Sequence, residues 1–82
     1  MDLDPGVFDR VVATIEEHFE YAGPPIMPET LANEVHGWDS LAHAVVIMKV
    51  EDAFGITLPD DQIFALRNVG DLALAVQKVQ GG

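Results

Sequence analysis

The sequence predicts an all-α domain with three longer helices and one short helix. Apolar residues recur at helical spacing in three segments, and glycine, proline or aspartate stands at the ends of those segments. The one short run that could form a strand, residues 56–58, would have no strand to pair with. The chain has 82 residues, enough for one domain, so we expect a single domain over residues 1–82.

The first helix is expected over Gly6–Glu20, after Asp4 and Pro5, because proline fits the first turn of a helix. Prolines interrupt the next stretch, Tyr21–Trp38, so we expect a long connection there with a short helical turn at Glu29–Asn33. A long connection without structure is unusual in a small domain, so its apolar side chains should tuck beneath it. These side chains are Ile26, Met27, Leu31 and Val35.

The second helix is expected over Ser40–Phe54, with Asp39 as its N-cap and Gly55 at its end. Its spacing separates two apolar faces. The inward face holds Val46, Ile47, Val50 and Phe54, and the outward face holds Leu41, Ala44, Val45 and Met48. A short helix over Asp60–Leu66 follows, and the last helix runs from Val69 to the terminal glycines.

Composition narrows the possible partners. Fourteen acidic residues face four basic ones, which gives a net charge of −10. Such a surface repels nucleic acid and anionic membranes and favours a basic protein partner. The absence of cysteine excludes disulfides and thiolate metal sites. With no signal peptide and no stretch of ~20 apolar residues, we expect a cytoplasmic protein. We also expect a monomer that stands alone, with an excised domain as the alternative.

The informative motif is Gly37–Leu41, which reads Gly-Trp-Asp-Ser-Leu. It places Ser40 in the first turn of an amphipathic helix, after a long loop and an acidic N-cap. Free backbone N–H groups and the positive end of the helix dipole lie there. A phosphodiester on Ser40 would therefore be well placed.

This pattern resembles the acyl carrier protein family, whose signature Asp-Ser-Leu opens the second helix. Two further segments match: Phe54–Asp60, which ends in Pro-Asp, and Val69–Asp71, which reads Val-Gly-Asp. The resemblance spans nearly the whole chain. It implies a four-helix bundle of the acyl-carrier type, with three longer helices and one short one.

The resemblance also implies a function. A phosphopantetheinyl transferase would move a 4'-phosphopantetheine arm from coenzyme A to Ser40, with Asp39 and Leu41 beside the attachment point. The arm would carry acyl groups as thioesters between the enzymes that load and process them, in a polyketide, fatty-acid or related specialised pathway. The core should loosen enough to shelter some acyl chains. We expect no enzyme activity, because no general base is placed to activate the serine.

In the family the second helix is the main recognition surface. Carried over to this sequence, the partner-binding residues are Trp38, Leu41, Ala44, Val45, Met48, Glu51 and Asp52. Ala42 and Val45 stand where acidic residues are common in fatty-acid carriers, and Lys49 adds a positive charge. These departures favour a dedicated partner in a specialised pathway.

Other interpretations stay open. The chain could be a peptidyl or D-alanyl carrier loaded by an adenylating enzyme, although Trp38 replaces the second glycine that peptidyl carriers often show there. It could also be an unmodified acidic helical protein that binds a basic partner. We interpret Trp38 as a loop residue packed on the rim and His43 as a solvated surface histidine. His36 and His43 do not form a zinc site, so no metal is expected.

Overall fold

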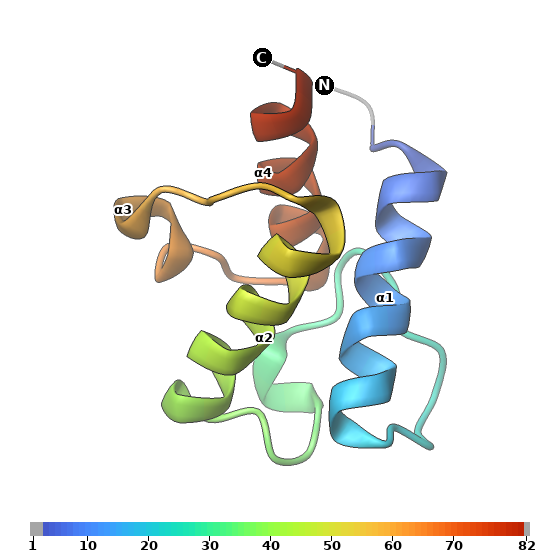
Figure 1. Ribbon diagram of the computed structural model, residues 1–82. Coiled ribbons are helices and arrows are strands. Elements are labelled where there is room, and N and C mark those ends of the chain that lie inside the picture. The colour runs from blue at the N-terminus through green and yellow to red at the C-terminus, as the bar shows by residue number, and fades with distance from the viewer. Residues whose placement is uncertain (1–2, 82) are drawn as a thin grey trace.

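The computed structural model describes residues 3–81, and Figure 1 shows their arrangement. The helices are α1 (Pro5–Phe19), α2 (Ser40–Phe54), α3 (Asp60–Ile63) and α4 (Val69–Gly81), with a 3₁₀ turn at Ala32–Glu34. Helix α1 packs against α2 and α4, and the short α3 lies at the side of the bundle opposite α1 in this view. The prediction of an all-α fold with three longer helices and a short one is confirmed.

The first two long helices begin and end where the sequence predicts, to within a residue. The Asp4 side chain accepts a hydrogen bond from the backbone N–H of Gly6 at 2.8 Å, and Asp39 accepts one from Ala42 at 2.8 Å. Helix α2 ends at Gly55, whose φ of 66° lies in the left-handed region that glycine adopts without strain. Local sequence therefore fixes where α2 starts, and with it the position of Ser40.

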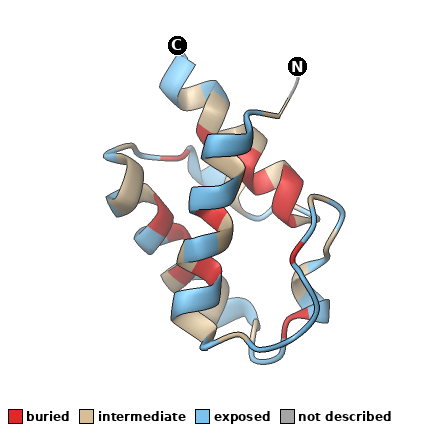
Figure 2. Cartoon of the chain, turned by 90° about the vertical axis from the view of Figure 1, so that its right-hand side faces the viewer, coloured by how far each residue is buried: buried red, intermediate tan, exposed pale blue. Residues whose placement is uncertain are grey.

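The core lies between α1, α2 and α4, where the buried faces of the helices meet (Figure 2). The predicted inward face of α2 is confirmed for Val46, Ile47 and Val50, which are at most 2% exposed. Phe54 is half-buried at the edge of this core, with the Arg10 guanidinium 5.3 Å from its ring centroid. The completely or nearly buried side chains are Val11, Ile15, Ile26, Val35, Val46, Ile47, Val50, Leu58, Val69, Leu72, Ala73 and Val76.

The connection between α1 and α2 differs from the prediction in two respects. Ile26 and Val35 are buried, but Met27 and Leu31 are 49% and 42% exposed, so the expectation that all four tuck under the loop is wrong for these two. The helical turn falls at Ala32–Glu34 and not at Glu29–Asn33. Backbone pairing sets the course of this segment, because Leu31 forms an isolated bridge with Asn68 next to α4.

The same connection is tied to the start of α4 by two backbone hydrogen bonds. The N–H of Val69 donates to the carbonyl of Thr30 at 2.9 Å, and that of Gly70 donates to Pro28 at 2.7 Å. A Cβ atom at position 70 would lie 2.8 Å from the Pro28 carbonyl oxygen. Gly70, in the Val-Gly-Asp start of α4, therefore allows the two backbones to approach closely. A residue with a Cβ atom would force one of the two backbones to move.

The connection between α2 and α4 carries α3, which stops at Ile63 and not at the predicted Leu66. The chain leaves the helix in a tight turn, in which the N–H of Ala65 donates to the Gln62 carbonyl at 3.1 Å. This turn leaves Phe64 75% exposed. None of the helices within residues 3–81 combines the length and the apolar character that crossing a membrane requires.

Candidate functional site

Ser40 is the first residue of α2 and is exposed to solvent. The chain reaches it through Gly37, which has a φ of 90°, and the N–H of Asp39 donates to the Gly37 carbonyl at 3.1 Å. This turn ends the long connection and directs the chain into α2. The serine hydroxyl is thus presented at a helix start that a partner enzyme can reach.

The backbone around Ser40 suits an attached phosphodiester. The Asp39 side chain accepts a hydrogen bond from the N–H of Ala42 at 2.8 Å. The Asp39 backbone carbonyl accepts one from the N–H of His43, also at 2.8 Å. The N–H groups of Ser40 and Leu41 belong to the first helical turn, which has no intrahelical acceptor for them. They and the helix dipole place positive potential beside the serine oxygen. The residues present therefore fit the phosphopantetheine that the sequence predicts.

A surface recess of about 360 Å³ opens beside Ser40. Its walls come from the 3₁₀ turn, the start of α2 and the segment after α3. Aromatic and apolar side chains dominate, with a few polar groups at the rim. The lining residues are Ala32, Asn33, Trp38, Asp39, Ser40, His43, Phe64 and Leu66.

His43 is not the solvated surface residue that we expected. Its ring is partly buried, and the Trp38 indole Nε1–H donates to its Nδ1 at 3.1 Å. Its Nε2 lies 2.9 Å from the carbonyl oxygen of Ile63, at the end of α3. Because an indole N–H can only donate, Nδ1 is unprotonated and Nε2 carries the proton that is donated to Ile63. The prediction failed because it considered only the face of α2 and not the segment that packs on it.

Aromatic rings form a row beside the candidate site. Trp38 stacks on Phe19 with centroids 5.4 Å apart and on His43 at 6.0 Å, and His43 meets Phe64 at 5.9 Å. Trp38 is half-buried and packs against the core, as its interpretation as a rim residue requires. Sequence reasoning missed Phe64, since one aromatic residue at the end of a short helix shows no periodicity.

The residues predicted to bind partners differ in how far they reach solvent. Leu41 and Met48 are 77% and 65% exposed, and Ala44 and Asp52 are also exposed along α2. Trp38 and Val45 are half-buried. The Glu51 carboxylate is engaged inside the molecule, where its Oε2 accepts the N–H of Leu58 at 2.7 Å. Leu41, Ala44 and Met48 therefore form an exposed apolar row on α2. The Glu51 carboxylate does not point out beside this row, because it is hydrogen-bonded to Leu58.

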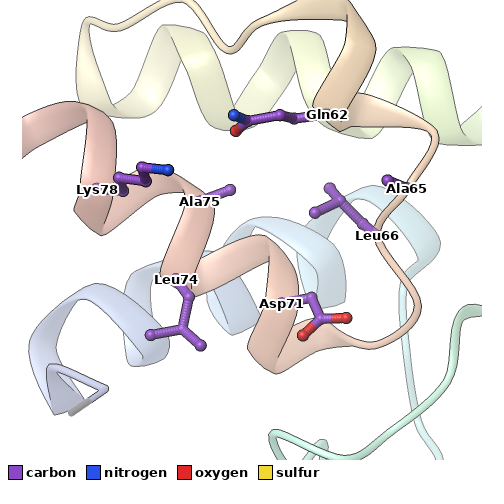
Figure 3. Close-up of a pocket in the computed structure, with 7 residues that line it drawn as sticks. All are labelled: Gln62, Ala65, Leu66, Asp71, Leu74, Ala75 and Lys78. Carbon is purple, nitrogen blue, oxygen red and sulfur yellow. The ribbon is translucent and has the colours of Figure 1, made fainter. Parts of the chain in front are cut away.

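A second hollow, of about 410 Å³, lies between the segment around α3 and helix α4 (Figure 3). It receives no residue from α2, and Leu66 lines both this hollow and the recess beside Ser40. Its lining residues are Gln62, Ala65, Leu66, Asp71, Leu74, Ala75 and Lys78. Among residues 3–81, no three histidine or acidic side chains gather where they could share a metal ion. The recess at Ser40 is therefore the candidate site.

The sequence matches the family described as phosphopantetheine attachment site over residues 9–76. It is 31% identical over 71 residues to an acyl carrier protein of Helicobacter pylori strain G27, a match that covers 87% of this chain and 91% of that protein. It is 34% identical over 56 residues to the mitochondrial acyl carrier protein of Dictyostelium discoideum. That match covers 68% of this chain but only 46% of the Dictyostelium protein.

The fold gives the same result as the sequence. The solution structure of a holo acyl carrier protein from Geobacter metallireducens is similar, with a TM-score of 0.82 and 31% sequence identity. The superposition covers 92% of this chain and 86% of that one. With an exposed serine at the start of α2 and a match over most of its length, this chain belongs to the acyl carrier protein family, whose cofactor is a covalently bound phosphopantetheine.

Proposed function

We propose that this chain carries acyl groups as thioesters on a 4'-phosphopantetheine arm attached to Ser40. The observation that carries the proposal is the exposed position of Ser40 at the start of α2, where Asp39 caps the helix and Leu41 lies beside it. The arm supplies a terminal thiol, which the chain itself lacks because it has no cysteine. A flexible tether raises the effective concentration of the carried group at each partner enzyme.

The chain contributes position and not catalysis. In the attachment reaction the Ser40 oxygen forms a bond to the pyrophosphate phosphorus of coenzyme A that bears the pantetheine. The bond from that phosphorus to the bridging oxygen breaks, adenosine 3',5'-bisphosphate leaves, and the hydroxyl proton passes to a base. His43 lies one turn further along the helix, but its Nδ1 accepts from Trp38 and its Nε2 faces the Ile63 carbonyl. It therefore has no free lone pair for the serine proton. The phosphopantetheinyl transferase must supply the base, and the carrier itself is not an enzyme.

The attachment is tested by intact mass after incubation with coenzyme A and a promiscuous phosphopantetheinyl transferase. The wild type should gain one phosphopantetheine unit, and Ser40→Ala should gain none. A folded wild-type sample that stays unmodified with several transferases would overturn the proposal. The chain would then be better described as an acidic helical protein that binds a basic partner without modification.

The exposed row on α2 is the proposed docking surface for the transferase and for the acyl-loading and acyl-processing enzymes. Leu41 and Met48 supply apolar contact, and Asp52 supplies charge. Met48→Ala should raise the KM of the transferase for the carrier several-fold and leave kcat nearly unchanged, since it removes contact area about two turns of α2 away from the reacting oxygen. Glu17→Ala on α1 is the control, and equal effects of the two changes would place docking elsewhere.

We propose that the chain serves a polyketide, fatty-acid or related specialised biosynthetic pathway. Relatives include the meromycolate extension acyl carrier protein of Mycobacterium leprae, 30% identical over 70 residues. Between Ser40 and Met48 α2 has no acidic residue, and Lys49 follows. This favours a partner that makes apolar contact near the serine. Parallel loading from acyl-coenzyme A and by amino-acid adenylating enzymes would separate this role from that of a peptidyl or D-alanyl carrier.

Two further features complete the proposal. We place the carrier in the cytoplasm as a monomer, although the Dictyostelium relative is mitochondrial. Cell fractionation tests the compartment. Sedimentation of the purified chain tests the monomer, and a concentration-dependent mass would contradict it.

A further inference from the structure

The imidazole of His43 connects three segments that meet beside Ser40. It belongs to α2, it accepts the indole N–H of Trp38 from the preceding loop at 3.1 Å, and its Nε2 lies 2.9 Å from the carbonyl of Ile63 in α3. Trp38 and Phe64 contact it through their rings. Both ring nitrogens are thus paired, and the ring fixes the end of α3 against the start of α2. This arrangement is called the His43 bridge below.

The His43 bridge lies between Ser40 and the core. On its outer side is the recess of about 360 Å³ that Ser40 itself lines. On its inner side the enclosed space measures about 10 Å³ and reaches Leu72, which is 1% exposed. That volume is close to the least that holds one water molecule. An acyl chain could reach the core on this side only if the bridge opened.

We propose that His43 is a specificity-determining residue, whose bridge keeps carried groups outside the bundle and so selects short acyl groups. The proposal rests on attachment at Ser40. Burying each additional CH₂ of a long chain is favourable, but here it requires separating α2 from α3. That separation would pull His43 away from the Ile63 carbonyl and leave that carbonyl without its partner. Short groups fit in the outer recess at no such cost. This proposal is the opposite of the expectation that the core shelters acyl chains, and the experiment below decides between them.

The test compares acetyl and octanoyl groups on the same carrier. Both are attached from the acyl-coenzyme A thioester by a promiscuous transferase, and methyl NMR shifts are recorded for the core residues Val46 and Leu72. In the wild type octanoyl should shift these methyls no more than acetyl does. In His43→Ala octanoyl should shift them several-fold more than acetyl. His36→Ala, at an exposed histidine, should behave as the wild type.

Two outcomes would overturn the proposal. If octanoyl shifts the core methyls of the wild type as strongly as those of His43→Ala, the bridge does not exclude long chains. If it shifts them in neither protein, something other than His43 closes the core. Should His43→Ala fail to fold, Trp38→Phe keeps a ring in place and removes only the indole donor. It should then show the larger octanoyl shift, and a wild-type response would count against the bridge.

The same experiment separates this proposal from the proposed function. Intact mass reports whether Ser40 is loaded, independently of the methyl shifts. If no transferase loads the wild type, Ser40→Cys provides the only thiol in the chain. A maleimide linker as long as the arm then carries the same two acyl groups to position 40. Exclusion of octanoyl from the core of this conjugate would support the His43 bridge even if the carrier role failed.

Discussion

The two connections that flank α2 are held to the molecule in different ways. The connection before α2 is fixed by backbone groups, since the start of α4 donates hydrogen bonds to the carbonyls of Pro28 and Thr30. The connection after α2, which carries α3, is held by side chains, two on α2 and Asp71 on α4, which accepts the N–H of Arg67 at 3.2 Å. Glu51 accepts the N–H of Leu58, and His43 faces a carbonyl at the end of α3. The first attachment requires one small residue, Gly70, whereas the second depends on the identity of several side chains.

This difference assigns the two connections different roles. Backbone pairing is nearly independent of side-chain identity, so the first connection presents Ser40 on a fixed turn. The second is held by contacts that can be lost one at a time, and it borders the recess beside Ser40. Regions held by few contacts open at lower free energy than the core does. We therefore expect the wall of the site formed by α3 to open more readily than the turn that carries the serine.

The largest effect should come from Gly70→Ala, which disturbs the backbone attachment. The new Cβ would lie 2.8 Å from the Pro28 carbonyl oxygen, so the loop must move away from α4. We expect the free energy of unfolding to fall by about 2 kcal/mol, as for other overpacked sites. Urea denaturation followed by circular dichroism measures it.

Gly81→Ala is the matched control for this change, because it adds the same atom to the same helix with nothing within 4 Å of it. Its stability should stay within about 0.5 kcal/mol of the wild type. If Gly70→Ala behaved like Gly81→Ala, the close approach to Pro28 would not hold the first connection.

The next effect concerns Glu51→Ala, which removes one of the side chains that hold the second connection. The N–H of Leu58, a residue only 2% exposed, loses its charged acceptor. We expect a loss of about 1–2 kcal/mol, the cost of leaving such a group unpaired. Hydrogen exchange should accelerate at Leu58 more than at Gly70.

Asp52→Ala is the neighbouring control for Glu51→Ala. It removes the same charge from the same end of α2, and Asp52 is exposed. Any effect of charge on the helix dipole is therefore shared by both variants, and their difference reports the hydrogen bond to Leu58. Equal stabilities would show that Glu51 is a surface charge, as the sequence suggested, and not a support of the second connection.

The sequence predicted features that depend on neighbouring residues better than features that depend on contacts between distant segments. The bounds of α1 and α2 were predictable because caps such as Asp39 and Gly55 act on their nearest neighbours. The loop before α2 was predicted less well, since Met27 and Leu31 carry no periodic signal and backbone pairing with α4 decides which side chains face the core. Local rules therefore predicted elements, and contacts between distant segments decided the rest.

The candidate site shows the same limit. Ser40 was found from its place after an acidic cap together with the resemblance of Asp39–Leu41 to the signature of the acyl carrier protein family, and both are local features. The partners of His43 and Glu51 were not, because Ile63 and Leu58 lie 20 and 7 residues further along the chain. Nothing in the spacing of α2 indicates where α3 will pack. Both side chains were consequently assigned to the surface, although each supports the second connection.

The smallest effect is the coupling between Trp38 and His43. A cycle of Trp38→Phe, His43→Ala and the double variant isolates their hydrogen bond, since Phe keeps a stacking ring and lacks the N–H donor. We expect a coupling of about 0.5–1 kcal/mol, typical of a neutral hydrogen bond that water partly reaches. Because Trp38 is the only tryptophan, unfolding must be followed by circular dichroism and not by fluorescence. Additive effects would mean that the two rings merely stack. His43 would then be held by α3 alone, and the second connection would depend on Glu51 more than on the His43 bridge.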